Sequence, residues 1–121
     1  MHPQKVIDNL IDLSKLKDGW YDGDGIAPSG NDIQWLVTEF IEHFSNGDEM
    51  PVCFPMICGG IFMEWCNREY DLTCEVYRET KKAYIHYLGI TNDTDNGIDV
   101  DLSVPEGWKT LKSFIKKSKS N

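Results

Sequence analysis

His86 and two glutamates are the residues of this chain best suited to acid–base chemistry. His86 lies in an alternating stretch, and the alternating stretch before it carries Glu75. If the two pair as antiparallel strands, His86 comes opposite Glu75, with Glu64 on the same face of the sheet. Such a cluster can act as a general acid–base pair, or it can be a cross-strand ion pair on an exposed surface.

The rest of the chain offers little catalytic chemistry. His2 stands at the start, and His43 falls late in a predicted helix, where a cation favours the negative end of the helix dipole. No nucleophile elbow, Walker loop, dinucleotide fingerprint or H-E-x-x-H motif occurs. The glycine-rich run 22–25 carries two aspartates, which would repel a phosphate. We therefore expect a protein that is not an enzyme.

The cysteines and the acidic loops do not match the spacing of known metal sites. No two cysteines have C-x-x-C spacing, and no histidine completes a zinc pattern. The EF-hand frame fails in both acidic loops, because Ser29 and Ser103 stand where the glutamate ligand belongs. The sequence predicts no metal and no cofactor, and leaves open only a weak cation site in those loops. We expect all four cysteines to be reduced and to pack as small buried hydrophobes; they are Cys53, Cys58, Cys66 and Cys74.

Charge divides the chain into an acidic body and a basic tail. The formal net charge is −8, and the last 19 residues carry five lysines against one glutamate. An acidic body repels nucleic acid, and cations at a helix C-terminus favour its dipole, so we expect no direct nucleic-acid contact. The longest apolar runs fall well short of the ~20 residues of a membrane span. With no signal peptide recognised, we expect a cytoplasmic protein without membrane contact.

The apolar spacing predicts a single α+β domain over residues 1–121, with residues 118–121 frayed. Two N-terminal helices and one C-terminal helix should pack on an antiparallel sheet of about four strands. The predicted helices cover residues 3–17, residues 29–44 and a segment that begins at Pro105. The predicted strands cover residues 51–57, 61–66, 70–78 and 83–90, with residues 98–102 as one further short strand at an edge.

The stretch 18–29 is predicted to be a structural loop between the first two helices. Gly23 and Gly25 allow backbone angles that other residues avoid, and Asp22 is typical of a turn. Trp20 is large and apolar, so we expect it to enter the core and fix the loop. Ser29 should cap the second helix.

Two short motifs carry a resemblance to a known set of proteins. The first runs from Leu16 to Ser29 with the pattern GW-DG-G-APS, and the second is Gly59-Gly60 followed by Glu64-Trp65. Together they resemble a widespread family of small bacterial and phage-associated proteins, over roughly residues 10 to 88. Cys58 departs from the pattern, where a more polar turn residue is expected. The resemblance implies a bacterial or phage origin and carries no activity with it.

Three functions remain open. The first is a protein-binding inhibitor of the immunity, antitoxin or phage anti-defence type, with a basic protein as its partner. The second is a DNA mimic that blocks a CRISPR-type or other nucleic-acid-binding complex. The third is a small hydrolase that uses Glu64, Glu75 and His86. The predicted binding face combines aromatic and charged side chains: Phe62, Glu64, Glu75, Tyr77, Tyr84 and His86. It exists only if the third helix leaves that side of the sheet uncovered.

Overall fold

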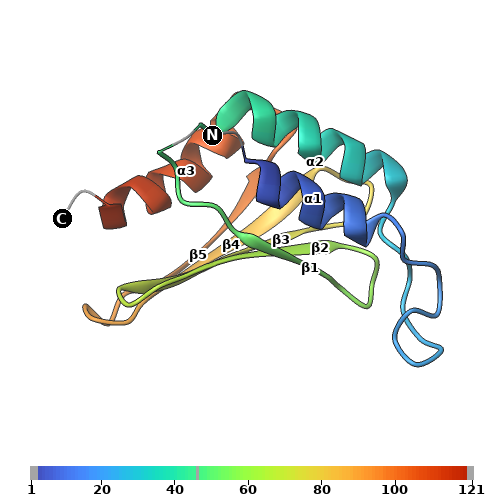
Figure 1. Ribbon diagram of the computed structural model, residues 1–121. Helices are drawn as coiled ribbons and strands as arrows, with labels where there is room; N and C mark the ends of the chain where they lie inside the picture. Colours follow the sequence, from blue (N-terminus) through green and yellow to red (C-terminus); the bar gives the residue numbers. More distant parts are fainter. Residues whose placement is uncertain (1–2, 46, 120–121) are drawn as a thin grey trace.

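Three helices lie on one face of a five-stranded antiparallel sheet in the computed structural model (Figure 1). The structure describes residues 3–45 and 47–119. The helices are α1 (Gln4–Leu13), α2 (Gly30–His43) and α3 (Pro105–Lys119). The strands are β1 (Val52–Pro55), β2 (Ile61–Cys66), β3 (Tyr70–Val76), β4 (Lys82–Gly89) and β5 (Asp95–Asp101). The predicted α+β class and helix order are confirmed, and the sheet has one strand more than the predicted four.

The sheet is a meander in which each strand pairs with the next one along the chain. Strand side chains alternate between the two faces, and the buried set lies under the helices. Met63, Cys74 and Ile85 are each fully buried and occupy neighbouring strands in register. The predicted division of β2, β3 and β4 into a buried face and a second face is confirmed.

All three helices turn their apolar stripes toward the same face of the sheet. The buried helix residues are Val6, Leu10, Leu13, Ile33, Leu36, Phe40, Trp108, Leu111 and Ile115. Trp108 joins α3 to α2, because its ring contacts Trp35, Phe40 and Phe44 at centroid distances of 5.8–6.3 Å. Its indole N–H donates to the backbone oxygen of Leu102 at 3.0 Å. In the described part of the chain, the opposite face of the sheet is left without a helix (Figure 1).

A side chain from α1 occupies the outer edge of β1. The amide oxygen of Asn9 accepts from the Cys53 N–H at 2.7 Å, and its amide nitrogen donates to the Cys53 carbonyl at 3.1 Å. These are the two groups that a further strand would use. Pro55 is the last residue of this strand, and proline within a sheet is restricted to edge strands and bulges because it lacks a backbone N–H. The second edge of the sheet is β5.

The loop between α1 and α2 is built around a tight turn at Asp22-Gly23. Tyr21 and Asp24 exchange both backbone hydrogen bonds at 2.8 Å, and both turn residues have positive φ, as a type I′ turn requires. The prediction that Trp20 enters the core is wrong. Trp20 is only half-buried; its ring lies against Gly25, and its N–H donates to the Ile26 carbonyl at 3.0 Å. The indole thus closes the loop on itself.

Several predicted boundaries need correction. Helix α1 ends at Leu13 rather than at residue 17, and α3 continues to Lys119 although we expected fraying from residue 118. The last two residues of the predicted tail lie outside the described part of the chain. The expected short strand at 98–102 is the seven-residue β5, which begins at Asp95.

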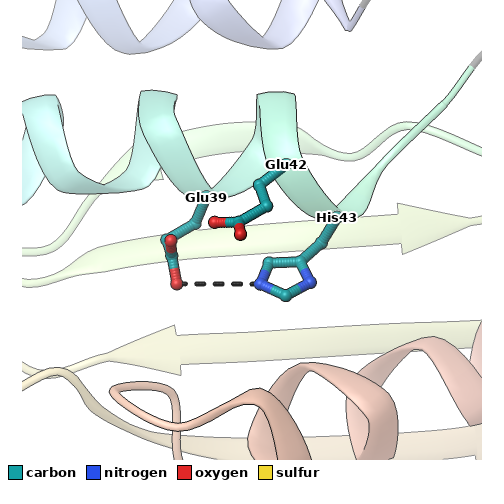
Figure 2. Close-up of side chains that lie close together, drawn as sticks. All are labelled: Glu39, Glu42 and His43. Atoms are coloured by element: carbon teal, nitrogen blue, oxygen red, sulfur yellow. Dashed lines mark ion pairs between the residues drawn. The ribbon is translucent and has the colours of Figure 1, made fainter.

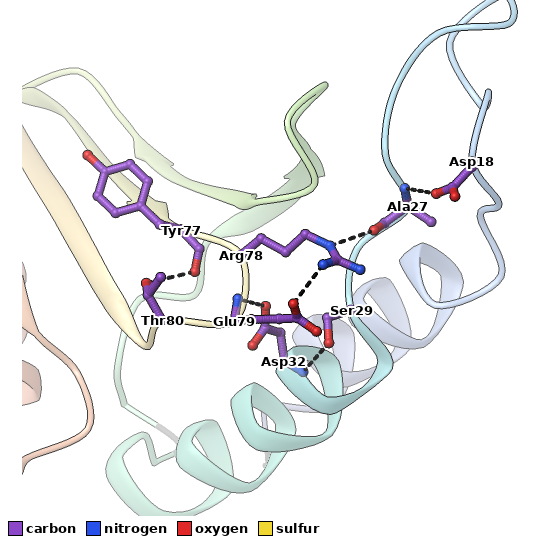
Figure 3. Close-up of polar contacts among 8 residues, drawn as sticks. All are labelled: Asp18, Ala27, Ser29, Asp32, Tyr77, Arg78, Glu79 and Thr80. Carbon is purple, nitrogen blue, oxygen red and sulfur yellow. Dashed lines mark hydrogen bonds and ion pairs between the residues drawn. The ribbon is translucent and has the colours of Figure 1, made fainter.

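A buried carboxylate connects the start of α2 to the turn between β3 and β4 (Figure 3). Asp32 is only 5% exposed, and its carboxylate accepts from the Glu79 N–H at 2.8 Å. Its own N–H donates to the Ser29 hydroxyl at 3.5 Å, which confirms the predicted cap. In the same turn, the Arg78 guanidinium pairs with Glu79 and donates to the Ala27 carbonyl. One polar network thus joins the structural loop, α2 and the β3–β4 turn.

Replacing Asp32 by alanine should lower the free energy of unfolding by about 1–3 kcal/mol, because the Glu79 N–H loses its acceptor and the first turn of α2 loses a negative charge. Urea unfolding followed by circular dichroism measures this change. Asp12→Ala is the matched control, since the Asp12 side chain is 75% exposed on α1 and its loss should cost no more than ~0.5 kcal/mol. Equal stability of the two variants would contradict the proposed role of Asp32.

Candidate functional site

The uncovered face of the sheet, called the open face below, gathers all six residues of the predicted binding face. The strand residues on this side alternate with the buried ones, and β5 supplies further acids. Its members are Val52, Phe54, Phe62, Glu64, Cys66, Asp71, Thr73, Glu75, Lys82, Tyr84, His86, Leu88, Asp95, Gly97, Asp99 and Asp101, with Tyr77 one residue beyond β3. The open face thus carries six carboxylates and one lysine among these residues, which makes the surface strongly acidic.

One row of side chains crosses the open face from edge to edge. The register places Phe54, Phe62, Glu75, Tyr84 and Asp99 side by side on the five strands. The rings of Phe54 and Phe62 lie 6.3 Å apart, so the β1 end of the row is apolar. The other end carries a phenol between two carboxylates. The hydroxyl and carboxylate groups at this end can bind cations and hydrogen-bond donors of a partner. The two phenyl rings at the β1 end can act as an apolar anchor.

Two tyrosines lie toward the β5 end of this row. The hydroxyl of Tyr84 lies over Gly97, where any side chain would collide with it: a Cβ built on Gly97 falls 1.9 Å from the oxygen. Tyr77 is 39% exposed. Desolvation, reinforced by the charges of Glu75 and Asp99, raises the pKa of the Tyr77 hydroxyl. This phenol therefore stays protonated at neutral pH and remains a hydrogen-bond donor.

The predicted pairing of His86 with Glu75 is wrong. Thr73 lies opposite His86, and Tyr84 lies opposite Glu75. His86 instead holds Asp95 of β5 through its Nε2 atom at 2.7 Å. Glu64 lies in the same cross-strand row as His86 but beyond Thr73, about two strand spacings or ~10 Å away. The open face thus contains His86, Glu64 and Glu75, but the register does not join them in one catalytic cluster.

Glu64 has a different partner, the carboxyl group of Asp71. A hydrogen bond with Asp71, desolvation and the Asp71 charge all raise the pKa of Glu64. The Oδ1 atom of Asp71 is buried and has no hydrogen-bond partner among the described residues. Two carboxyl groups this close favour sharing a proton over ionising together. Asp71 thus disfavours the ionised form of Glu64.

The cysteines are only partly as predicted. Cys53 and Cys74 are buried, and burial raises the pKa of the Cys53 thiol to about 12. Cys58 and Cys66 are exposed, so they do not act as core residues. Among the described residues, Cys66 joins Glu64 and Asp71 in one of two groups whose side chains lie close enough to hold an ion. The second group, Glu39, Glu42 and His43, lies on α2 (Figure 2).

Sequence reasoning missed several residues of the open face. Asp71 lies on the open face because it is two residues before Thr73 and four before Glu75, and alternate residues of a strand share a face. The alternation of β3 was therefore enough to predict its position. Asp95 and Asp99 were assigned to a solvated loop and to an edge strand, so their position beside His86 and Tyr84 was not foreseen. Their alternation at 95, 97, 99 and 101 was the available signal, but its acidic and glycine residues have low strand propensity.

Comparisons with protein-family models, with curated proteins and with solved structures find no match for this chain. The resemblance based on the loop and the Gly59-Gly60 motif therefore stays a prediction. Within the described residues, every helix is too short or too polar to cross a lipid bilayer.

Replacing Glu64 by glutamine should stabilise the protein at pH 7. The raised pKa of Glu64 means that this group favours the folded state while it is protonated, below its ordinary pKa of 4.5, and that this contribution is lost as the pH rises through the folded-state pKa. Glutamine is neutral throughout, so the gain should be present at pH 7 and should vanish below about pH 4.5. Urea unfolding at a series of pH values measures it.

The Asp71→Asn background provides the control for this prediction. Without the neighbouring carboxyl group, Glu64→Gln should bring little further gain at pH 7. A gain that is the same at pH 4 and pH 7, or that is undiminished in the Asp71→Asn background, would show that the two carboxyl groups are not coupled.

Proposed function

We propose that this protein acts by binding a basic protein through the open face of its sheet. The observation that carries the proposal is the one-sided packing of the helices, which leaves an acidic and aromatic sheet surface uncovered. A sheet usually buries at least one face. A second face that exposes several aromatic side chains to water is unfavourable in free energy, and such surfaces are typical of binding sites. The charge of this face favours a partner with clustered lysines or arginines.

The physical properties of the face fit a binding surface of the inhibitor type. Phe62 and Tyr84 are half-buried, so their rings are already held by the sheet and lose little freedom on binding. In the register Glu75 lies between the two rings, and Asp99 lies on the other side of Tyr84. Aromatic anchors surrounded by charges are typical of interface hot spots and of fast, electrostatically guided association. An immunity protein, an antitoxin or a phage anti-defence inhibitor would need these properties.

A second candidate is mimicry of a nucleic acid. Asp95, Asp99 and Asp101 share one side of β5, the free edge of the sheet, and neighbouring side chains on one side of a strand lie ~7 Å apart. A line of carboxylates at an edge can occupy a groove built for phosphates. The hydrolase alternative has less support, because Asp95 rather than a glutamate holds the imidazole of His86.

Asp99→Lys should weaken partner binding at least tenfold, because it reverses a charge beside Tyr84 on the open face. Asp12→Lys makes the same charge change on α1, away from that face, and should leave binding unchanged. The measurement compares the amount of a stoichiometric protein retained from bacterial extract by immobilised wild type and by each variant. Tyr84→Ala should reproduce the loss without changing the charge. Equal retention by wild type and by both open-face variants would exclude the open face as the binding surface.

Salt separates the two candidates. Binding through aromatic anchors should persist when salt is raised several-fold, whereas phosphate mimicry should weaken steeply because it depends on exposed charges. The affinity of the captured partner, measured from about 0.05 M to about 0.5 M salt, distinguishes protein docking from phosphate mimicry. A steep loss for wild type that Tyr84→Ala leaves unchanged would favour mimicry over the proposed protein-docking role.

A further inference from the structure

The last turns of α2 hold a cluster of charged side chains that the proposed function does not use (Figure 2). Glu39, Glu42 and His43 stand at positions i, i+3 and i+4, a spacing that brings side chains to one side of a helix. One oxygen from each carboxylate and one imidazole nitrogen all lie within 4.8 Å of one another. In Figure 2 both carboxylates lie beside the ring of His43. The cluster lies on the helix layer and is separate from the open face.

The distance between the two half-buried members suits a bound ion. The Nε2 atom of His43 lies 3.8 Å from the Oε1 atom of Glu39. This exceeds the ~3.2 Å limit of a good N–H···O hydrogen bond. Two ligands that each lie ~2.1 Å from a tetrahedral zinc are about 3.4 Å apart. Small side-chain rotations would therefore place both atoms on one metal ion.

Packing fixes the imidazole before any ligand arrives. The ring of His43 stacks on the buried ring of Trp108, at 5.4 Å between centroids and 12° between planes. The side chains of His43 and Glu39 are only 23% and 16% exposed. A ligand that is already held loses little freedom on binding. Glu42 is exposed and closes the group from the solvent side.

The local charge also favours a cation. Two carboxylates lie beside the last residue of α2, where the helix dipole is negative. One cation close to the cluster is Lys112, whose ammonium group donates to the backbone oxygen of His43 and pairs with Asp48 at 3.2 Å. Because Asp48 compensates this charge, Lys112 opposes a bound ion only weakly.

We propose that Glu39, Glu42 and His43 form a binding site for a divalent transition metal of the zinc class, with a water molecule as its fourth ligand. One imidazole and two carboxylates are ligands that zinc accepts, whereas calcium and magnesium prefer oxygen alone. The other candidate group among the described residues contains no imidazole, and partial desolvation together with the charges of Asp71 and Glu64 raises the pKa of its Cys66 thiol. A protonated thiol is a poor metal ligand.

Titration of the chelator-treated full-length chain with zinc chloride tests this site. Isothermal titration calorimetry should find one zinc ion per chain, and His43→Gln and Glu39→Gln should each lower the association constant at least tenfold. Cobalt(II) should bind in place of zinc, with visible absorption from nitrogen and oxygen ligands and without the charge-transfer band of a thiolate. Zinc should raise the melting temperature of the wild type but not that of His43→Gln.

Matched variants keep the test independent of folding and of other ligands. His86→Gln removes an imidazole elsewhere, and Cys66→Ser removes the thiol of the other group; both should bind zinc as the wild type does. If His43→Gln unfolds, the exposed Glu42→Gln variant replaces it, with an expected loss of at least tenfold. No stoichiometric zinc, binding that neither helix variant weakens, or binding lost in Cys66→Ser would overturn the proposal. None of these measurements involves the partner of the open face.

Discussion

The packing of Trp108 decides which surface of this protein meets the solvent. Its indole lies among the rings of Trp35 and Phe40 on α2 and of Phe44, the residue that follows this helix, so α3 lies on the same side of the sheet as α1 and α2. A third helix on the other side would have buried the row from Phe62 to Asp99. One aromatic contact between two helices thus determines both the hydrophobic core and the exposure of the acidic face. The same ring also orients His43, so it links the core to a second candidate site.

The strands show how far sequence reasoning reaches. The faces of β2, β3 and β4 follow from simple alternation, and the structure confirms them. Which residue of β3 lies opposite which residue of β4 cannot be read from the alternation, because the register depends on the geometry of the turn between them. In this turn the Tyr77 N–H donates to the Lys82 carbonyl, and Glu79 and Lys81 have positive φ. The difference moves the pairing of His86 by two residues, from Glu75 to Thr73. A shift of two keeps every side chain on its face, so the face was predictable although the contacts were not.

Other features depend on shapes that a linear pattern does not contain. The large, apolar side chain of Trp20 predicted a position in the core. Instead its ring packs against Gly25 in its own loop, where a glycine leaves room for it. Cys58 and Cys66 looked like core residues by composition, and only their positions in the turn and on the open face make them exposed. The group on α2 was readable as i, i+3 and i+4 spacing. The packing that holds its imidazole in place could not be predicted from this spacing, because it comes from Trp108, 65 residues after His43 in the chain.

The hydrogen bonds of Asn9 have a consequence for self-association. A sheet polymerises when both of its edges can accept another strand, since each added chain then offers a new edge. Here the amide of Asn9 occupies the middle of one edge, at Cys53, so β5 is the edge of the described sheet that remains for a further strand. Pairing through β5 would join two chains and leave no free edge for a third. Growth into a fibre is therefore blocked by one side chain on a helix, and the acidic open face need not protect the protein against it.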